Sequence, residues 1–254
     1  MKKFNHEDVL LANKQYYNEV ADSYLENESY AYTSVIKKDV ESIMTRSASL
    51  CTNNGFFLDI GCGSGFLSKI VSDENLFEAC LGVDISEKQV EMYNQYFKTK
   101  KNFEARVGDA TNLVSLESNT VDMVAGFSVL HHFFDYHAVL AECLRVLKPG
   151  GVAYFDFEPN SEFRKKMHFF VKLRRKLLPK SPSSDDGLED VAEFHNNYSM
   201  GIDFHSIVEN FSDEMEVIET GGRYIQTPIG LLMFWFRFMG DISKPLFYFV
   251  VRKK

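Results

Sequence analysis

A glycine-rich turn follows the first short apolar run of the chain, residues 56–60 (FFLDI). Gly61, Cys62 and Gly63 begin this turn, and a helix-like pattern continues from Phe66. Glycines lack Cβ atoms, so the backbone can come close to a ligand, and the free N–H groups at the start of a helix can face it. The G-x-G-x-x-G pattern of dinucleotide sites would need a glycine at position 66, which is phenylalanine in this chain. The chemistry indicated is binding of a small extended ligand at the end of a strand.

An acidic residue, Asp59, precedes the turn by two positions. Its carboxylate would repel a pyrophosphate and attract a ligand that carries an ammonium and a sulfonium group. S-adenosylmethionine carries both groups, so it is the expected ligand in preference to NAD, and an NAD-dependent oxidoreductase is disfavoured. A single aspartate at a strand end is also a common capping or ion-pairing residue. The other strand ends must therefore agree before Asp59 is given a ligand role.

Two more aspartates end the next two apolar runs. Asp84 lies in the run 80–85 (CLGVDI), where it can accept hydrogen bonds from both hydroxyls of a ribose. Asp109 follows the run 103–107 (FEARV), where it can accept from the amino group of an adenine. The carboxyl ends of parallel strands lie at one edge of a sheet, and open α/β sheets bind their ligands there. The aspartates together therefore predict one ligand site.

Several segments, in this order, resemble the motifs of class I S-adenosylmethionine-dependent methyltransferases, within the small-molecule group that includes the ubiquinone and menaquinone methyltransferases. They are 58–65 (LDIGCGSG), 82–86 (GVDIS), 108–110 (GDA), 121–133 (VDMVAGFSVLHHF) and 144–151 (LRVLKPGG), with a looser match at 16–24 (YYNEVADSY). The ordered set is more specific than any one motif. The resemblance implies an enzyme that uses S-adenosylmethionine as cofactor. The residues expected at the cofactor are Tyr17, Tyr24, Asp59, Gly61, Cys62, Gly63, Asp84, Ile85, Gly108, Asp109, Ala110, Gly126 and Phe127.

Tyr17 and Tyr24 have two interpretations. They are seven residues apart and share one face of a helix, which favours packing in the core. The resemblance instead suggests a lid whose aromatic rings attract the sulfonium.

Methyl transfer needs alignment, exclusion of water and an acceptor atom with a free lone pair. A base helps when the acceptor is a hydroxyl, and His132, just after the fourth apolar run, is the candidate catalytic residue. The alternative is that His132 only binds backbone, while His131 points elsewhere. Asp156 and Glu158 could orient an amine or hold a metal, but solvent exposure or local capping is favoured, so no metal site is predicted.

The apolar runs predict an α/β fold. They lie at 56–60, 80–85, 103–107, 121–127 and 151–157, alternate with amphipathic segments, and are followed by late strand candidates at 215–220 and 246–251. This alternation is typical of a parallel sheet covered on both faces. The resemblance implies the Rossmann-like seven-stranded methyltransferase sheet, with its last strand antiparallel. A helix is expected to begin at Ser86, and another to stop at 148–151 (KPGG).

Domain boundaries follow from the same pattern. We expect an N-terminal helical cap over 1–50 and the methyltransferase domain over 51–254. Within that domain, 159–212 would be an insertion between strands 5 and 6, and 213–254 would hold the final strand pair with the aromatic connection 229–239.

Composition excludes several classes of protein. The 254 residues are 45% hydrophobic and 25% charged, which excludes a disordered or collagen-like chain. The net charge of −8 argues against nonspecific binding of nucleic acid, so no nucleic-acid partner is expected. The four cysteines have no metal-ligand or disulfide spacing, and no apolar run is long enough to span a membrane. A cytoplasmic protein is predicted.

One segment is also compatible with peripheral contact with the inner face of a membrane. Residues 162–180 contain eight Lys or Arg residues with apolar residues between them. A lid helix with a solvated charged face is the commoner outcome, and subunit contact is a third interpretation.

The predicted function is methyl transfer to O, N or C of a small hydrophobic acceptor, and the alternative is a noncatalytic S-adenosylmethionine-binding protein that uses 159–254 as a partner surface.

Overall fold

The computed structural model describes residues 4–22, 33–166, 188–197, 199–223 and 244–254. Three predictions fall wholly or mostly outside these residues. They are the role of Tyr24, the basic segment 162–180 beyond residue 166, and the aromatic run 229–239. Within the described part, no helix is both long and apolar enough to cross a bilayer.

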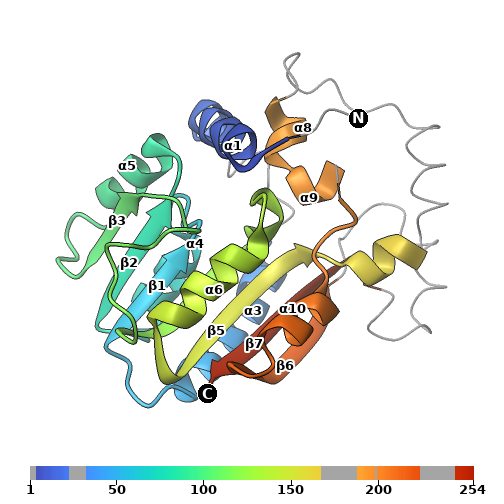
Figure 1. Ribbon diagram of the computed structural model, residues 1–254. Coiled ribbons are helices and arrows are strands. Elements are labelled where there is room, and N and C mark those ends of the chain that lie inside the picture. Colours follow the sequence, from blue (N-terminus) through green and yellow to red (C-terminus); the bar gives the residue numbers. More distant parts are fainter. Residues whose placement is uncertain (1–3, 23–32, 167–187, 198, 224–243) are drawn as a thin grey trace.

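Seven strands form one sheet in the order β3-β2-β1-β4-β5-β7-β6 (Figure 1). β7 is antiparallel to both β5 and β6, and the other neighbouring pairs are parallel. The predicted α/β fold and its seven-stranded sheet are confirmed. The strands are β1 (Phe56–Ile60), β2 (Ala79–Asp84), β3 (Phe103–Val107), β4 (Val121–Phe127), β5 (Leu147–Pro159), β6 (Met215–Arg223) and β7 (Leu246–Lys253).

Helices cover both faces of the sheet. The described helices are α1 (His6–Val20), α3 (Ser34–Ser49), α4 (Phe66–Asp73), α5 (Glu87–Tyr96), η1 (Leu130–His132), α6 (Tyr136–Val146), α8 (Leu188–Ala192), α9 (Phe194–Asn197) and α10 (Phe204–Phe211). α6 and α10 bury apolar residues against one face, whereas α3 and α4 do so against the other. All seven residues of β4 are buried, as expected for a central strand covered on both sides.

The two N-terminal helices have different positions. α3 packs under the sheet through Val40, Ile43 and Met44, so it belongs to the sheet layers. α1 instead lies across the carboxyl edge of the sheet, next to α8 (Figure 1). Asn5 caps α1, because its side chain accepts from the Asp8 N–H while the Asp8 carboxylate accepts from the Asn5 N–H. Among the described residues of the predicted N-terminal cap, α1 is therefore the part that can reach a ligand.

The helix before β5 ends earlier than predicted. Ser86 does cap α5 as expected, through a hydrogen bond from the Gln89 N–H. α6, however, ends at Val146, and the 148–151 segment forms part of β5. The register between β4 and β5 shifts there, between Val121 and Met123, so the Pro and Gly residues form an irregularity within a strand.

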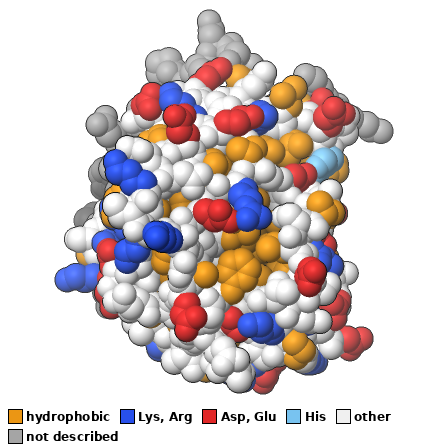
Figure 2. All heavy atoms as spheres, turned by 90° about the vertical axis from the view of Figure 1, so that its left-hand side faces the viewer, with side chains coloured by type: hydrophobic (Ala, Val, Ile, Leu, Met, Phe, Trp, Pro, Cys, Tyr) orange, Lys and Arg blue, Asp and Glu red, His pale blue; other side chains and the backbone are white. Residues whose placement is uncertain are grey.

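The edge strand β3 has an alternating pattern, with Glu104 and Arg106 exposed. Figure 2 shows apolar side chains between charged ones on this side of the molecule, and Tyr96 of α5 and Val107 of β3 are about half exposed. Charged side chains on an edge strand oppose pairing with another sheet.

Candidate functional site

A pocket lies at the carboxyl edge of the sheet, between the strand ends and α1. Its space, including the part open to solvent, is about 1020 Å³. Nearly all of the residues predicted at the site line it, although Gly126 does not and Tyr24 is not among the described residues. The predicted residues that line the pocket are Tyr17, Asp59, Gly61, Cys62, Gly63, Asp84, Ile85, Gly108, Asp109, Ala110, Phe127 and His132.

The glycines of the turn have different functions. Gly61 and Gly63 have φ angles of +59° and +50°, which residues with a Cβ rarely adopt. A Cβ on Gly61 would lie 2.2 Å from Val129 Cγ2, so this glycine is needed for packing. A Cβ on Gly63 would meet only Gln89 Oε1, at 3.8 Å, and would otherwise project into open space. Gly63 is therefore the position at which a ligand can approach the backbone.

Asp84 joins the turn to the end of β2. Its Oδ2 accepts from the Gly63 N–H at 2.8 Å, and its Oδ1 accepts from the Ser86 N–H at 2.9 Å. Burial raises the pKa of Asp84, although these N–H donors oppose the rise. The carboxylate thus holds the glycine turn in place and still borders the pocket.

Gln89 is a site residue that was not predicted. Its side chain is buried in the pocket wall, and its Oε1 has no hydrogen-bond partner within the described part of the chain. Leaving a buried acceptor unpaired is costly, so such an atom indicates a donor on a bound molecule. Ribose hydroxyls are donors of this kind, and the residues present therefore fit the nucleoside part of S-adenosylmethionine.

Asp59 caps the first turn of α4, which was the alternative to a ligand role for this residue. Its Oδ2 accepts from Ser68 N and Oγ, at 3.1 and 2.6 Å, in the first turn of α4. Burial raises the pKa of Asp59 to about 7, against the opposing effect of the Ser68 hydrogen bonds. A carboxyl with this pKa is only partly charged near neutral pH, so the attraction expected from Asp59 for a cationic ligand is weakened.

Asp109 contacts α1 through His6, a second residue that was not predicted. Asp109 Oδ2 lies 3.0 Å from His6 Nε2, and its Oδ1 accepts from the Thr111 N–H at 2.8 Å. His6 belongs to a stripe on one face of α1 that lines the pocket. The stripe consists of His6, Val9, Leu10, Asn13 and Tyr17, whose helical spacing in the sequence was the signal that could have found it.

His132 is held by two contacts from distant parts of the chain. Its Nδ1 lies 2.9 Å from the carbonyl oxygen of Ala192, and its Nε2 lies 3.0 Å from the hydroxyl of Tyr17. A carbonyl oxygen can only accept, so we assign the proton to Nδ1 and the lone pair to Nε2. Burial and the charge of His131 lower the pKa of His132, while the Glu193 carboxylate opposes this change. His132 is thus a neutral imidazole with a basic nitrogen at the pocket.

Glu158 anchors the η1 turn that carries both histidines. It is fully buried, so the expected solvent exposure was wrong. Its Oε1 accepts from the N–H groups of Val129 and Leu130, at 2.8 and 2.9 Å, and its Oε2 lies 2.8 Å from His131 Nδ1. Local capping, the alternative prediction for Glu158, is confirmed. Asp156 is also fully buried, in a bidentate ion pair with Arg223 at 2.5 Å.

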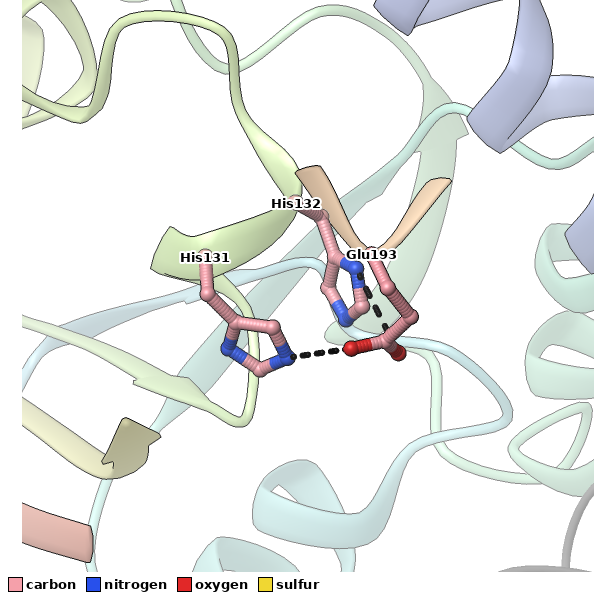
Figure 3. Close-up of side chains that lie close together, drawn as sticks. All are labelled: His131, His132 and Glu193. Atoms are coloured by element: carbon pink, nitrogen blue, oxygen red, sulfur yellow. Dashed lines mark ion pairs between the residues drawn. The ribbon is translucent and has the colours of Figure 1, made fainter. Parts of the chain in front are cut away.

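His131, His132 and Glu193 converge beside the pocket (Figure 3). One ligand atom from each lies within 4.8 Å of the others, so this group could hold a metal ion. The same atoms have partners without one, since His131 Nε2 lies 3.5 Å from Glu193 and His131 Nδ1 binds Glu158. Burial lowers the pKa of His131, but the two carboxylates outweigh it and raise this pKa to about 10. His131 is therefore an imidazolium that lies between the carboxylates of Glu158 and Glu193.

Comparisons with known proteins indicate a methyltransferase domain. Residues 58–155 match a family model described as a methyltransferase domain. A probable S-adenosylmethionine-dependent methyltransferase of Mycolicibacterium smegmatis is 25% identical over 191 residues, which are 75% of this chain and 60% of that protein. A ubiquinone biosynthesis O-methyltransferase of Thiobacillus denitrificans is 28% identical over 100 residues, 39% of this chain and 42% of that protein. The chain thus spans less than two thirds of the length of these relatives.

Solved structures share the fold at low sequence identity. An S-adenosylmethionine-dependent methyltransferase of Anabaena variabilis has a TM-score of 0.64 at 18% identity, covering 99% of this chain and 96% of that chain. An N-methyltransferase of Bradyrhizobium japonicum, solved with S-adenosylhomocysteine, has a TM-score of 0.56 at 13% identity, covering 87% of this chain and 88% of that chain. The matched motifs, the sheet and the family model agree that residues 58–155 carry a methyltransferase domain, and the relatives support a class I, S-adenosylmethionine-dependent type.

Proposed function

We propose that the protein transfers the methyl group of S-adenosylmethionine to a hydroxyl oxygen of a small hydrophobic acceptor. The observation that carries this proposal is the basic Nε2 of His132 at the pocket, with its tautomer fixed by the Ala192 carbonyl. A base is useful for a hydroxyl acceptor, because the oxygen loses its proton as the methyl group arrives.

The residues of the chain have distinct tasks in this reaction. Gly63, Asp84 and Gln89 bind the nucleoside at the strand ends. S-adenosylmethionine supplies a methyl group that its sulfonium already activates. His132 Nε2 accepts the proton of the acceptor hydroxyl once that hydroxyl has displaced the Tyr17 hydroxyl, which lies 3.0 Å from the same nitrogen.

An apolar acceptor fits the rest of the lining. The pocket wall near His132 includes Phe133 and Phe134, and Val9 and Leu10 of α1 face the same space. These side chains offer an acceptor few hydrogen-bond partners and exclude water from the reacting atoms, which favours transfer.

A methyl-transfer assay tests the proposal. Wild-type protein would be incubated with S-adenosylmethionine and separate panels of phenols, hydroquinones, amines and fatty acids, and methylated products identified by mass spectrometry. We expect product with a hydroxyl-bearing aromatic acceptor, and a loss of about 10²- to 10⁴-fold in its rate in His132→Gln. His205→Gln is the matched control, because His205 is exposed on α10 and, among the described residues, pairs with Glu209 alone.

Three outcomes would contradict parts of the proposal. Methylation of amines alone, with no effect of His132→Gln, would refute the assignment of oxygen and of the base. Binding of S-adenosylhomocysteine without transfer to any acceptor would favour the noncatalytic alternative. Absence of S-adenosylhomocysteine binding in calorimetry would refute the cofactor itself.

A further inference from the structure

The pocket-facing stripe of α1 is fixed at both of its ends. His6 contacts Asp109, which the sequence analysis places at the adenine amino group. Tyr17 contacts His132, which we place at the reacting atoms. Asn13 lies between them, seven residues after His6 and therefore roughly 10 Å along the helix. Its place in the pocket is thus away from the adenine and toward the amino-acid part of the cofactor.

The amide of Asn13 has a fixed orientation. Its Nδ2 donates to two carbonyl oxygens, those of Val9 at 2.9 Å and of His132 at 3.0 Å. Both hydrogens of the amide are used, and a flipped amide would set its oxygen against two acceptors. Oδ1 must therefore be the remaining atom, and it has no hydrogen-bond partner among the residues that the structure describes.

This unpaired oxygen needs a donor from outside the chain. Asn13 is 6% exposed and lines the pocket, so Oδ1 is removed from bulk water. A buried acceptor that lacks a partner destabilises the protein, whereas a ligand that supplies a donor gains that bond on binding. The oxygen is thus suited to accept a hydrogen bond from the bound cofactor.

S-adenosylmethionine carries three kinds of hydrogen-bond donor. Asp109 is available for the adenine amino group, and Asp84 with Gln89 is available for the ribose hydroxyls. The ammonium of the amino-acid part is the donor that is left, and Asn13 Oδ1 is an unpaired acceptor for it in addition to Asp59, whose Oδ2 already holds Ser68. We infer that Asn13 binds the cofactor ammonium through Oδ1, so that α1 recognises the amino-acid part of the cofactor. This inference rests on the proposed binding of S-adenosylmethionine.

Two ligands and two variants test the assignment by calorimetry. S-adenosylhomocysteine contains the ammonium, whereas 5′-methylthioadenosine has the same nucleoside and thioether without the amino-acid part. Asn13→Leu keeps the approximate volume but removes the acceptor, so its affinity for S-adenosylhomocysteine should fall about tenfold or more. Its affinity for 5′-methylthioadenosine should not change.

A matched control is Asn210→Leu, the same change in α10, where Asn210 bonds to Ser206 alone within the described part of the chain. It should leave both affinities unchanged. Equal losses for the two ligands in Asn13→Leu would overturn the inference, because they would indicate a disturbed helix. Unchanged affinity for S-adenosylhomocysteine in that variant would also overturn it. Failure of the wild type to bind S-adenosylhomocysteine would instead refute the proposed function.

Discussion

The two ends of the pocket are built over very different distances along the chain. At the strand-end side, Asp84 binds Gly63 across 21 residues, and it binds Ser86 across two. At the acceptor side, His132 binds Tyr17 across 115 residues and Ala192 across 60. The nucleoside side is therefore formed by neighbouring strand ends of one sheet, whereas the acceptor side requires α1, η1 and α8 to meet. Changes in α8 should alter the acceptor side and leave the nucleoside side intact, whereas α1 contacts both sides, through His6 at Asp109 and Tyr17 at His132.

The largest expected effect is on the nucleoside side, at Gly63. In Gly63→Val a β-branched residue would have to adopt a φ of +50°, and its side chain would enter the space beside Gln89. We expect binding of S-adenosylhomocysteine to become undetectable in calorimetry while the protein still unfolds cooperatively. Gly61→Val is the comparison, since the clash with Val129 should lower thermal stability first. Normal affinity in Gly63→Val would place the ligand elsewhere.

Asp84 should give the next largest effect. Asp84→Asn leaves one oxygen for the Gly63 N–H but removes the charge and one acceptor for the ribose. A loss of about tenfold or more in affinity for S-adenosylhomocysteine is expected. Asp109→Asn should cost less, because a single adenine amino group is involved and His6 already occupies one oxygen. Equal losses in the two variants, measured by calorimetry, would contradict this ranking.

The same contrast explains what could be predicted from the sequence. Strand-end residues such as Asp84 are readable, because a strand, a turn and a helix cap lie within a few residues of one another. Asn13 and Gln89 were missed, since each faces the pocket only after its helix packs on the sheet. The capping partners of Glu158 lie 27 to 29 residues before it. The sequence next to Glu158 therefore gave no indication that this residue is buried.

The strands and helix ends of the fold were likewise predictable only where local sequence determines them. The apolar runs of the central strands predicted the order of elements, because strands covered on both faces are apolar along their whole length. The end of α6 was misplaced because Pro149 and Gly150 also suit a bulged strand, and the pairing of β5 with β4 decides between the two.

If His132 is the base on the acceptor side, its protonation should determine the pH dependence of turnover. Burial and the charge of His131 lower the pKa of His132, so the base stays deprotonated below its ordinary pKa of 6.5. We expect kcat/KM for a hydroxyl acceptor to stay constant above about pH 6.5 and to fall only in more acidic solution. Removing the neighbouring charge in His131→Gln should move this fall to higher pH. A rate that rises through pH 7 to 9 in the wild type would argue against His132 as the base.

The last expected effect concerns stability on the acceptor side. The pKa of His131 is raised from 6.5 to about 10 by Glu158 and Glu193, which outweigh the effect of burial. The folded state therefore keeps a proton that the unfolded state loses above about pH 6.5, so this contribution is fully present below that pH. It should decline as the pH rises and be lost near pH 10. Urea unfolding of the wild type across this range should show the decline relative to His131→Gln, whereas His205→Gln should follow the wild type. A constant difference between the wild type and His131→Gln at all pH values would mean that Glu158 holds the η1 turn through its backbone hydrogen bonds alone.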